Sequence, residues 1–299
     1  MAEGGKPILC VGALTLDTIF QMDELPAGPG KFLPLEAVEV AAGMASSAAT
    51  TIARLGGAVA LWASVGDDAT GRRLIAEIAS EGVDCSAVRL VAGTRSAFAT
   101  ILVDRQGERI IVPRYGPALL SAPATTPDMA SFAAVMTDVR WPEAAARALS
   151  AARLAGIPAI LDADVATDET LGLLLPLATH IVASEPAARR VTGIADTAGA
   201  VTELAQRYDA FVAVTAGPEG VYWYDRGRVE HVVAPSVIAR DTLAAGDVFH
   251  GAFALGLVEG MPIDAIMAFA ATAAAIKCET FGGRLGAPKR EAVLARLKV

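Results

Sequence analysis

The chain has 299 residues, of which 54% are hydrophobic and 19% charged, so it can bury a large core and is neither disordered nor fibrous. A formal net charge of −8 argues against nucleic acid or an anionic membrane as the main partner, because both require a broad basic surface. The three cysteines lack the spacing of zinc ligands, which indicates reduced thiols. With no basic start of a signal peptide, and an Ala-rich stretch at 265–278 too short to span a bilayer, we expect a cytoplasmic protein.

Apolar runs of strand length alternate with helical segments along the chain. This pattern predicts a mostly parallel sheet covered by helices on both faces, in a single α/β domain over residues 1–299. Predicted strands lie at 8–13, 59–65, 133–137, 159–162, 180–183 and 211–215. Predicted helices lie at 46–55, 70–80, 143–155, 185–191, 198–208 and 265–278.

Two stretches, at about 18–40 and 96–115, break this alternation and look like extended, partly polar strands. Asp104 to Gly107 forms a good hairpin turn in the second of them. A small β layer that serves as a lid over a site would account for both stretches, and ordinary edge strands would account for them equally well. Because exposed lids often mediate dimer contacts, we expect a homodimer.

Polar residues follow several predicted strands, where ligands bind in open parallel sheets. No GxGxxG and no GxxxxGK[ST] motif is present, so a nucleotide site must be built in another way. The residues that this rule selects are Asp17, Asp138, Arg140, Asp162, Asp164 and Thr215 to Gly217.

The densest chemical signal is the run from Asp241 to Gly251, DTLAAGDVFHG, which leads into an apolar helical stretch. The small residues Ala244, Ala245 and Gly246 allow backbone N–H groups at the start of a helix to approach a phosphate. Asp247 follows at once and could accept the proton of an attacking hydroxyl. An ordinary helix start with a first-turn acid explains the same residues.

The chain resembles the ribokinase-like (PfkB) sugar kinases over essentially its whole length. The family signature DTxxAGD matches Asp241-Thr-Leu-Ala-Ala-Gly-Asp247. Three further motifs occur in family order: Ala42-Gly-Met-Ala45 followed by Ala53-Arg-Leu-Gly56, then Val65-Gly-Asp-Asp-Ala-Thr-Gly71, and Val214-Thr-Ala-Gly-Pro-Glu-Gly220. The resemblance implies a three-layer α/β/α fold with a small β-sheet lid, and transfer of the γ-phosphoryl group of ATP to a sugar hydroxyl.

The resemblance also implies roles for individual residues. Mg²⁺ would arrive with ATP and bridge its phosphates, so few protein ligands are expected. Asp247 would be the catalytic base, and the amides of Ala244, Ala245 and Gly246 would form the anion hole. Asp17 and Gly43 would contact sugar hydroxyls, and Thr215, Gly217 and Gly220 would line the nucleotide site. Asp241 and Leu243 would hold a monovalent cation such as K⁺, with Gly282 and Gly286 completing its site.

Two departures from the family pattern affect the site. Met44 replaces the Asn that usually contacts the sugar, and the NxxE motif linked to Mg²⁺ reads Ser184-Glu-Pro-Ala187. Glu185 could replace the motif's acid through water, or it could be a first-turn acid of a helix, and we favour the second interpretation.

Several segments are similar to the sulfofructose kinases of this family, including Gly30-Lys31 and Asp138-Val-Arg-Trp141. This similarity places Lys31 and Arg140 at the anionic end of a ketohexose, with Arg114 as an additional cation. Solvated Lys31 and Arg114, with Arg140 paired to Asp138, would instead leave a neutral ketohexose such as fructose. A nucleoside kinase of the same family and a catalytically silent sugar or nucleotide sensor are the rival functions, and His250 is expected to be a packed core histidine.

Overall fold

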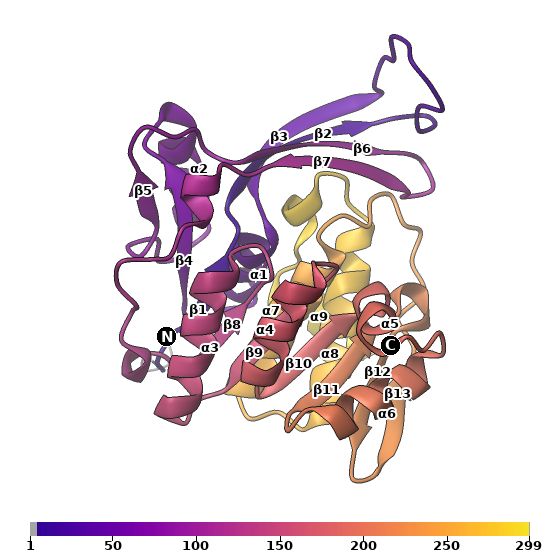
Figure 1. The fold of residues 1–299 in the computed structure, drawn as a ribbon. Helices are drawn as coiled ribbons and strands as arrows, with labels where there is room; N and C mark the ends of the chain where they lie inside the picture. Colours follow the sequence, from indigo (N-terminus) through magenta and orange to yellow (C-terminus); the bar gives the residue numbers. More distant parts are fainter. Residues whose placement is uncertain (1–4, 299) are drawn as a thin grey trace.

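Two β-sheets organise residues 5–298, the part of the chain that this computed structural model describes (Figure 1). Within these residues the larger sheet has nine strands in the order β13-β12-β11-β10-β9-β8-β1-β4-β5. Neighbours are parallel from β5 to β11, and the last two pairings, β11 with β12 and β12 with β13, are antiparallel. The strands are β1 (Ile8–Gly12), β4 (Val59–Gly66), β5 (Arg89–Val91), β8 (Ala134–Thr137), β9 (Ala159–Ala163), β10 (His180–Ser184), β11 (Phe211–Thr215), β12 (Val221–Asp225) and β13 (Arg228–Val232).

Helices cover both faces of this sheet, as the apolar strands require. Alternate residues of β1 enter different cores: Ile8 and Cys10 pack with one set of helices, and Leu9 and Val11 with the other. The first set contains α1 (Met44–Arg54), α2 (Ala69–Ser80), α7 (Ala245–Val258), α8 (Ile263–Cys278) and α9 (Arg290–Leu297). The second contains α3 (Pro142–Ala155), α4 (Asp168–Leu174), α5 (Glu185–Thr192) and α6 (Thr197–Arg207).

The smaller sheet lies across one end of the larger one, over the carboxyl ends of its parallel strands (Figure 1). Its order is β3-β2-β6-β7, with β2 (Thr15–Gln21), β3 (Glu36–Ala42), β6 (Phe98–Val103) and β7 (Arg109–Arg114). Asp104 closes the β6–β7 turn by accepting the amides of Gln106 and Glu108 at 2.9 Å each. The two irregular stretches therefore form a separate lid sheet, not edge strands of the main sheet.

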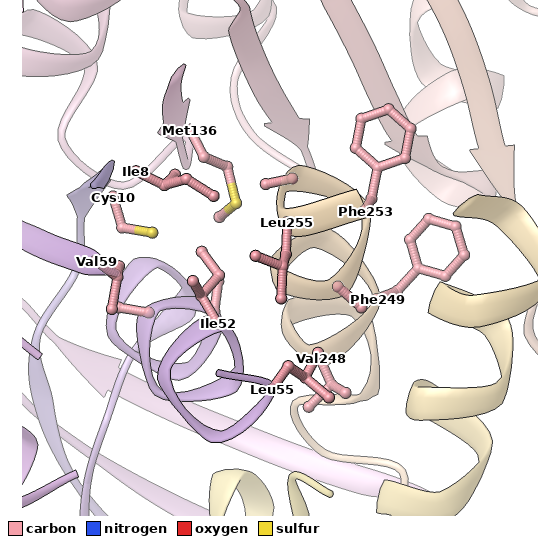
Figure 2. Close-up of a cluster of buried hydrophobic side chains, with 14 of the residues drawn as sticks. Ile8, Cys10, Ile52, Leu55, Val59, Met136, Val248, Phe249, Phe253 and Leu255 are labelled. Atoms are coloured by element: carbon pink, nitrogen blue, oxygen red, sulfur yellow. The ribbon is translucent and has the colours of Figure 1, made fainter. Parts of the chain in front are cut away.

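Helices α1 and α7 pack unusually closely, and their contact positions the candidate site. A Cβ added at Gly251 would lie only 2.6 Å from the carbonyl oxygen of Ala48, so glycine is required for this approach. Figure 2 shows Ile52 of α1 beside Leu255 of α7, and both side chains lie within 3 Å of where a Cβ at Gly57 would be, at 2.8 and 2.6 Å. Gly251 and Ala48 allow the two helix backbones to approach, while Ile52 and Leu255 fill the core between these helices and the sheet.

Most predicted elements of the large sheet and its helices are confirmed to within two residues. The mainly parallel α/β/α architecture with a β-sheet lid is also confirmed. Among residues 5–298, no helix has both the length and the apolar composition needed to cross a bilayer.

Candidate active site

A cavity of about 700 Å³ lies beneath the lid, at the carboxyl edge of the large sheet. Its walls come from the inner face of the lid, from the turn before α1 and from the first turn of α7. Three predicted sugar-site residues, Asp17, Gly43 and Arg140, and the predicted base Asp247 line it together. The structure thus gathers at one place residues that are up to 230 positions apart in the sequence.

Asp247 lies in the first turn of α7 and faces this cavity. Its side chain does not cap the helix and accepts no hydrogen bond from the described part of the protein. Burial, followed by the nearby carboxylate of Asp162, raises the pKa of Asp247 well above its usual value. A half-buried carboxylate without a protein donor is suited to accept a proton from a ligand.

The turn before Asp247 presents backbone amides toward the same space. Ala244 is the N-cap residue of α7 and adopts a left-handed conformation, with φ of 65°. The amide of Ala245 donates to the carbonyl of Thr242 at 3.2 Å, so this predicted anion-hole donor is partly engaged by the protein. Among the described residues, the amides of Ala244, Gly246 and Asp247 have no acceptor, and a Cβ added at Gly246 would meet nothing within 4 Å. The open N-terminus of α7 can therefore take an anion.

Asp138 fixes the floor of the site without facing it. Its buried carboxylate accepts the amides of Ala13 at 2.8 Å, Ala45 at 3.0 Å and Arg140 at 2.7 Å. These bonds join the ends of β1 and β8 to the start of α1. Gly43 completes the junction with φ of 111°, since a Cβ there would lie 2.5 Å from the carbonyl oxygen of Ala13.

Asp17 projects from β2 into the cavity and is only 8% exposed. It accepts a hydrogen bond from the Thr15 hydroxyl at 2.7 Å. Burial raises the pKa of Asp17 to about 6, although the Thr15 bond acts in the opposite direction. One oxygen remains available to accept a hydroxyl of a ligand.

A second cavity, of about 440 Å³, continues from the first on the other side of the α7 N-terminus. Predicted nucleotide-site residues Thr215, Gly217 and Gly220 line it, together with an apolar wall from 233–239 and α8. Gly220 has φ of 94°, and a Cβ there would lie 2.0 Å from the carbonyl oxygen of Val232. An apolar slot that opens onto free helix amides suits an aromatic base attached to phosphates.

Of the three cationic residues predicted to bind an anionic sugar, only Arg140 lines the cavity. Lys31 and Arg114 do not line the cavity, and the Arg114 guanidinium lies over the ring of Phe98 on the outer face of the lid. Arg140 does line the cavity, but its guanidinium donates to Asp164 and to the carbonyl of Val165, each at 3.0 Å. Its side-chain partner is therefore Asp164 and not Asp138.

The altered NxxE segment forms the start of α5. Ser184 caps the helix by accepting the amide of Ala187, and Glu185 pairs with Arg189 in the same helix. Glu185 is thus the first-turn acid that we favoured, although it also lines the cavity, as does Met44. No group of three or more His, Cys, Asp or Glu side chains in residues 5–298 is arranged to hold a metal ion.

Asp241 lies just behind the anion-hole turn and is fully buried. Its carboxylate accepts the amides of Leu243 at 2.8 Å, Gly282 at 3.0 Å and Gly283 at 2.8 Å. These bonds link the turn before α7 to the segment after α8.

His250 and Arg109 contribute to the site in ways that the sequence did not reveal. His250 is buried as expected, with its ring nitrogens 2.7 Å from the Gly246 carbonyl and 3.0 Å from the Val182 carbonyl. It thereby ties the first turn of α7 to β10. Arg109, on the inner face of the lid, donates to the Thr242 hydroxyl at 2.8 Å and links the lid to the anion-hole turn. The alternation of β7 could have indicated Arg109, because it shares a face with Ile111 and Pro113.

A half-buried carboxylate beside open helix amides, between an apolar slot and a polar cavity, is the arrangement expected of an α/β phosphotransferase with an alcohol group as acceptor. The sequence matches the pfkB family carbohydrate kinases over residues 6–290, and the chain belongs to that family.

Relatives with assigned names agree with this class. A ribokinase of Haemophilus influenzae is 28% identical over 307 residues, which cover 98% of this chain and 99% of that protein. A fructokinase of Klebsiella pneumoniae is 30% identical over 262 residues, covering 81% and 83% of the two chains.

Solved structures show the same fold. The crystal structure of an Agrobacterium tumefaciens protein described as a candidate ribokinase is 48% identical, with a TM-score of 0.94 over 99% of this chain and 98% of that one. The Arabidopsis thaliana ribokinase, complexed with ribose and ATP, has a TM-score of 0.84 at 24% identity and covers 99% and 100% of the chains. At that identity the second likeness shows the fold alone.

Proposed function

We propose that this sugar kinase transfers the γ-phosphoryl group of ATP to a hydroxyl of a small uncharged sugar, a ketohexose or a pentose. The observation that carries the proposal is the position of Asp247, whose carboxylate lies without a protein donor where the two cavities meet. The apolar cavity would take the adenine of ATP, and the cavity under the lid would take the sugar. The names of the ribokinase and fructokinase relatives support both acceptors.

In this proposal the chemistry depends on position and charge. The sugar hydroxyl attacks the γ-phosphorus while the bond to the β-phosphate oxygen breaks, and ADP leaves. Asp247 accepts the hydroxyl proton, and the amides of Gly246 and its neighbours stabilise the charge on the transferring group. Asp17 orients the sugar by accepting another hydroxyl. Mg²⁺ would enter on the ATP phosphates and would neutralise part of their charge.

The charges of the sugar cavity favour an uncharged acceptor. Two of the three arginines of the lining are paired with acids: Arg140 with Asp164, and Arg284 with acids behind the cavity, while Arg109 bonds the neutral hydroxyl of Thr242. The acids that line the cavity outnumber these cations; they are Asp17, Asp162, Asp164, Glu185 and Asp247. A sulfonate or phosphate bound at Arg140 would have to displace Asp164, and anywhere in this cavity it would face a surplus of carboxylates.

A panel of acceptors with ATP tests the proposal. ADP release would be followed with fructose, ribose, fructose 6-phosphate, sulfofructose and adenosine, with Asp247→Asn as the low-activity control. We expect kcat/KM for a neutral sugar to exceed that for either anionic sugar at least tenfold. A preference for sulfofructose would reassign Arg140 to anion binding. Phosphorylation of adenosine alone would make the protein a nucleoside kinase, and sugar binding without any turnover would make it a sensor.

We also propose that two copies pair through the outer face of the lid. Phe98, Ile110 and Val112 lie on that face and are between 39% and 61% exposed, which is unusual for large apolar side chains on neighbouring strands. A second lid sheet would cover these side chains without obstructing the sugar cavity on the opposite face.

A further inference from the structure

Lys277 is a fully buried lysine in the last turn of α8. Lysine is almost never completely buried unless it is paired, because removing an ammonium group from water is costly. The position is therefore informative, and its partners indicate what the ammonium does.

Among the described residues, the Lys277 ammonium makes its hydrogen bond and its ion pair with one residue, Asp241. Nζ donates to the Asp241 carbonyl oxygen at 2.5 Å and lies 3.2 Å from Oδ2 of the Asp241 carboxylate. The same carboxylate accepts the three amides described above, from Leu243, Gly282 and Gly283. Asp241 is thus enclosed by one ammonium group and three N–H donors, with no exposure to solvent.

This arrangement controls the turn that precedes the catalytic helix. Asp241 lies three residues before Ala244, whose left-handed conformation turns the chain into α7. The amide of Asp241 also donates to the Cys278 carbonyl at 3.2 Å. Both the amide and the carbonyl of Asp241 are therefore bonded to the end of α8. Movement of Lys277 would shift the amides that face the phosphoryl group.

The residues expected to hold a monovalent cation do not fit a free ion here. A K⁺ ion held by the Asp241 carboxylate would lie beside the Lys277 ammonium, which is 3.2 Å from Oδ2 and also donates to the Asp241 carbonyl oxygen. The ammonium would repel a second positive charge at the same oxygens. Gly282 and Gly283 also direct N–H groups at the carboxylate, and an N–H group cannot be a ligand of a cation.

We propose that the ammonium of Lys277 is a built-in monovalent cation, a positioning group that holds the anion-hole turn in place of K⁺ and makes the kinase independent of potassium. The catalytic part of this inference rests on the proposed function, while the cation independence of the fold does not.

The first test uses the unaltered protein in potassium-free buffer. Turnover and Tm would be compared in KCl, NH4Cl and tetramethylammonium chloride at equal ionic strength, because the last cation is too large for the site. We expect rates within twofold and Tm values within 1 °C across the three salts. Activation of more than fivefold by KCl, or a specific rise in Tm, would overturn the inference.

The second test removes the side chain and offers a cation in its place. Lys277→Ala should lower kcat at least tenfold and lower Tm in tetramethylammonium chloride, and KCl or NH4Cl should restore part of both in a saturable manner. Lys277→Met should be impaired without rescue, since its side chain fills the space. Lys289→Ala, at an exposed lysine further along the chain, is the matched control and should be unaffected in every salt.

Loss of stability in Lys277→Ala without any cation-specific recovery would reduce Lys277 to a structural ion pair and refute the proposal. The Tm measurements require no sugar. If no sugar were phosphorylated, the proposed function would fail, while the Tm response to cations would still decide this inference.

Discussion

Replacement of Asp247 by asparagine should lower turnover and stabilise the fold in the same variant. Loss of a general base costs a factor of roughly 10²–10⁴ in kcat, which corresponds to about 3–5 kcal/mol at the transition state. ATP binding should persist, because the apolar slot and the helix amides remain. A coupled assay of ADP release measures the loss of kcat, and calorimetric titration with ATP measures whether ATP binding persists.

The gain in stability follows from the surroundings of the carboxylate. Burial and the carboxylates of Asp162, Asp164 and Asp138 raise the pKa of Asp247, while His250 lowers it, so this carboxylate costs more to ionise in the folded protein than in the unfolded chain. A neutral amide removes that cost, which we place at about 1 kcal/mol because the side chain is partly exposed. Tm should rise by roughly 2 °C in a chain of this size.

A matched control is available at another helix. Asp264 is an exposed first-turn acid of α8, away from both cavities, and Asp264→Asn should keep full activity without any gain in Tm. If Asp247→Asn retained kcat within tenfold of the unaltered protein, Asp247 would not be the base. A fall in Tm would show that the carboxylate stabilises the fold, contrary to the geometry described.

Three further predictions concern other parts of the molecule. Because the pKa of Asp17 is raised to about 6, its ionised form, which would accept sugar hydroxyls, is lost as the pH falls through 6. KM for the sugar should therefore rise about tenfold per pH unit below that value. Asp17→Asn should have a high KM that does not depend on pH in this way. Gly251→Val should destabilise the fold by at least about 2 kcal/mol in urea unfolding, because its side chain would overlap the Ala48 carbonyl, whereas the open position Gly246 should tolerate alanine in stability and lose turnover. Val112→Glu on the outer lid face should yield monomers by sedimentation with unchanged monomer Tm, and an unaltered protein that is already monomeric would contradict the proposed pairing.

The architecture was accessible from the sequence because local signals specify it. Apolar strand-length runs, helix caps such as Asp68 and Ser184, and the glycine that ends α3 all act within a few residues. The run of small residues before Asp247 likewise indicated the start of α7 correctly. Such features are fixed by backbone conformation and by nearest neighbours along the chain.

Side-chain partners distant in the sequence were not accessible in this way. The Arg140 guanidinium binds Asp164, 24 residues away, although Asp138 is much closer in the sequence. The Asp138 carboxylate instead accepts three backbone amides, two of which belong to other elements. Lys277 and Asp241 are 36 residues apart, and neither carries a local pattern that signals the other.

The close contact between α1 and α7 has a consequence for how the two substrates are held. Gly251 lies four residues, or about 6 Å of helix, beyond Asp247, and Ala48 lies a similar distance beyond Gly43. In the proposed function, the N-terminus of α1 borders the sugar and the N-terminus of α7 borders the phosphates, and the two helices touch about one turn further along. The spacing of the two helix N-termini is set by main-chain contact between Gly251 and Ala48. Substitutions of the side chains that would contact the sugar therefore leave this spacing unchanged, so the sugar preference can vary while the hydroxyl and the phosphoryl group stay aligned.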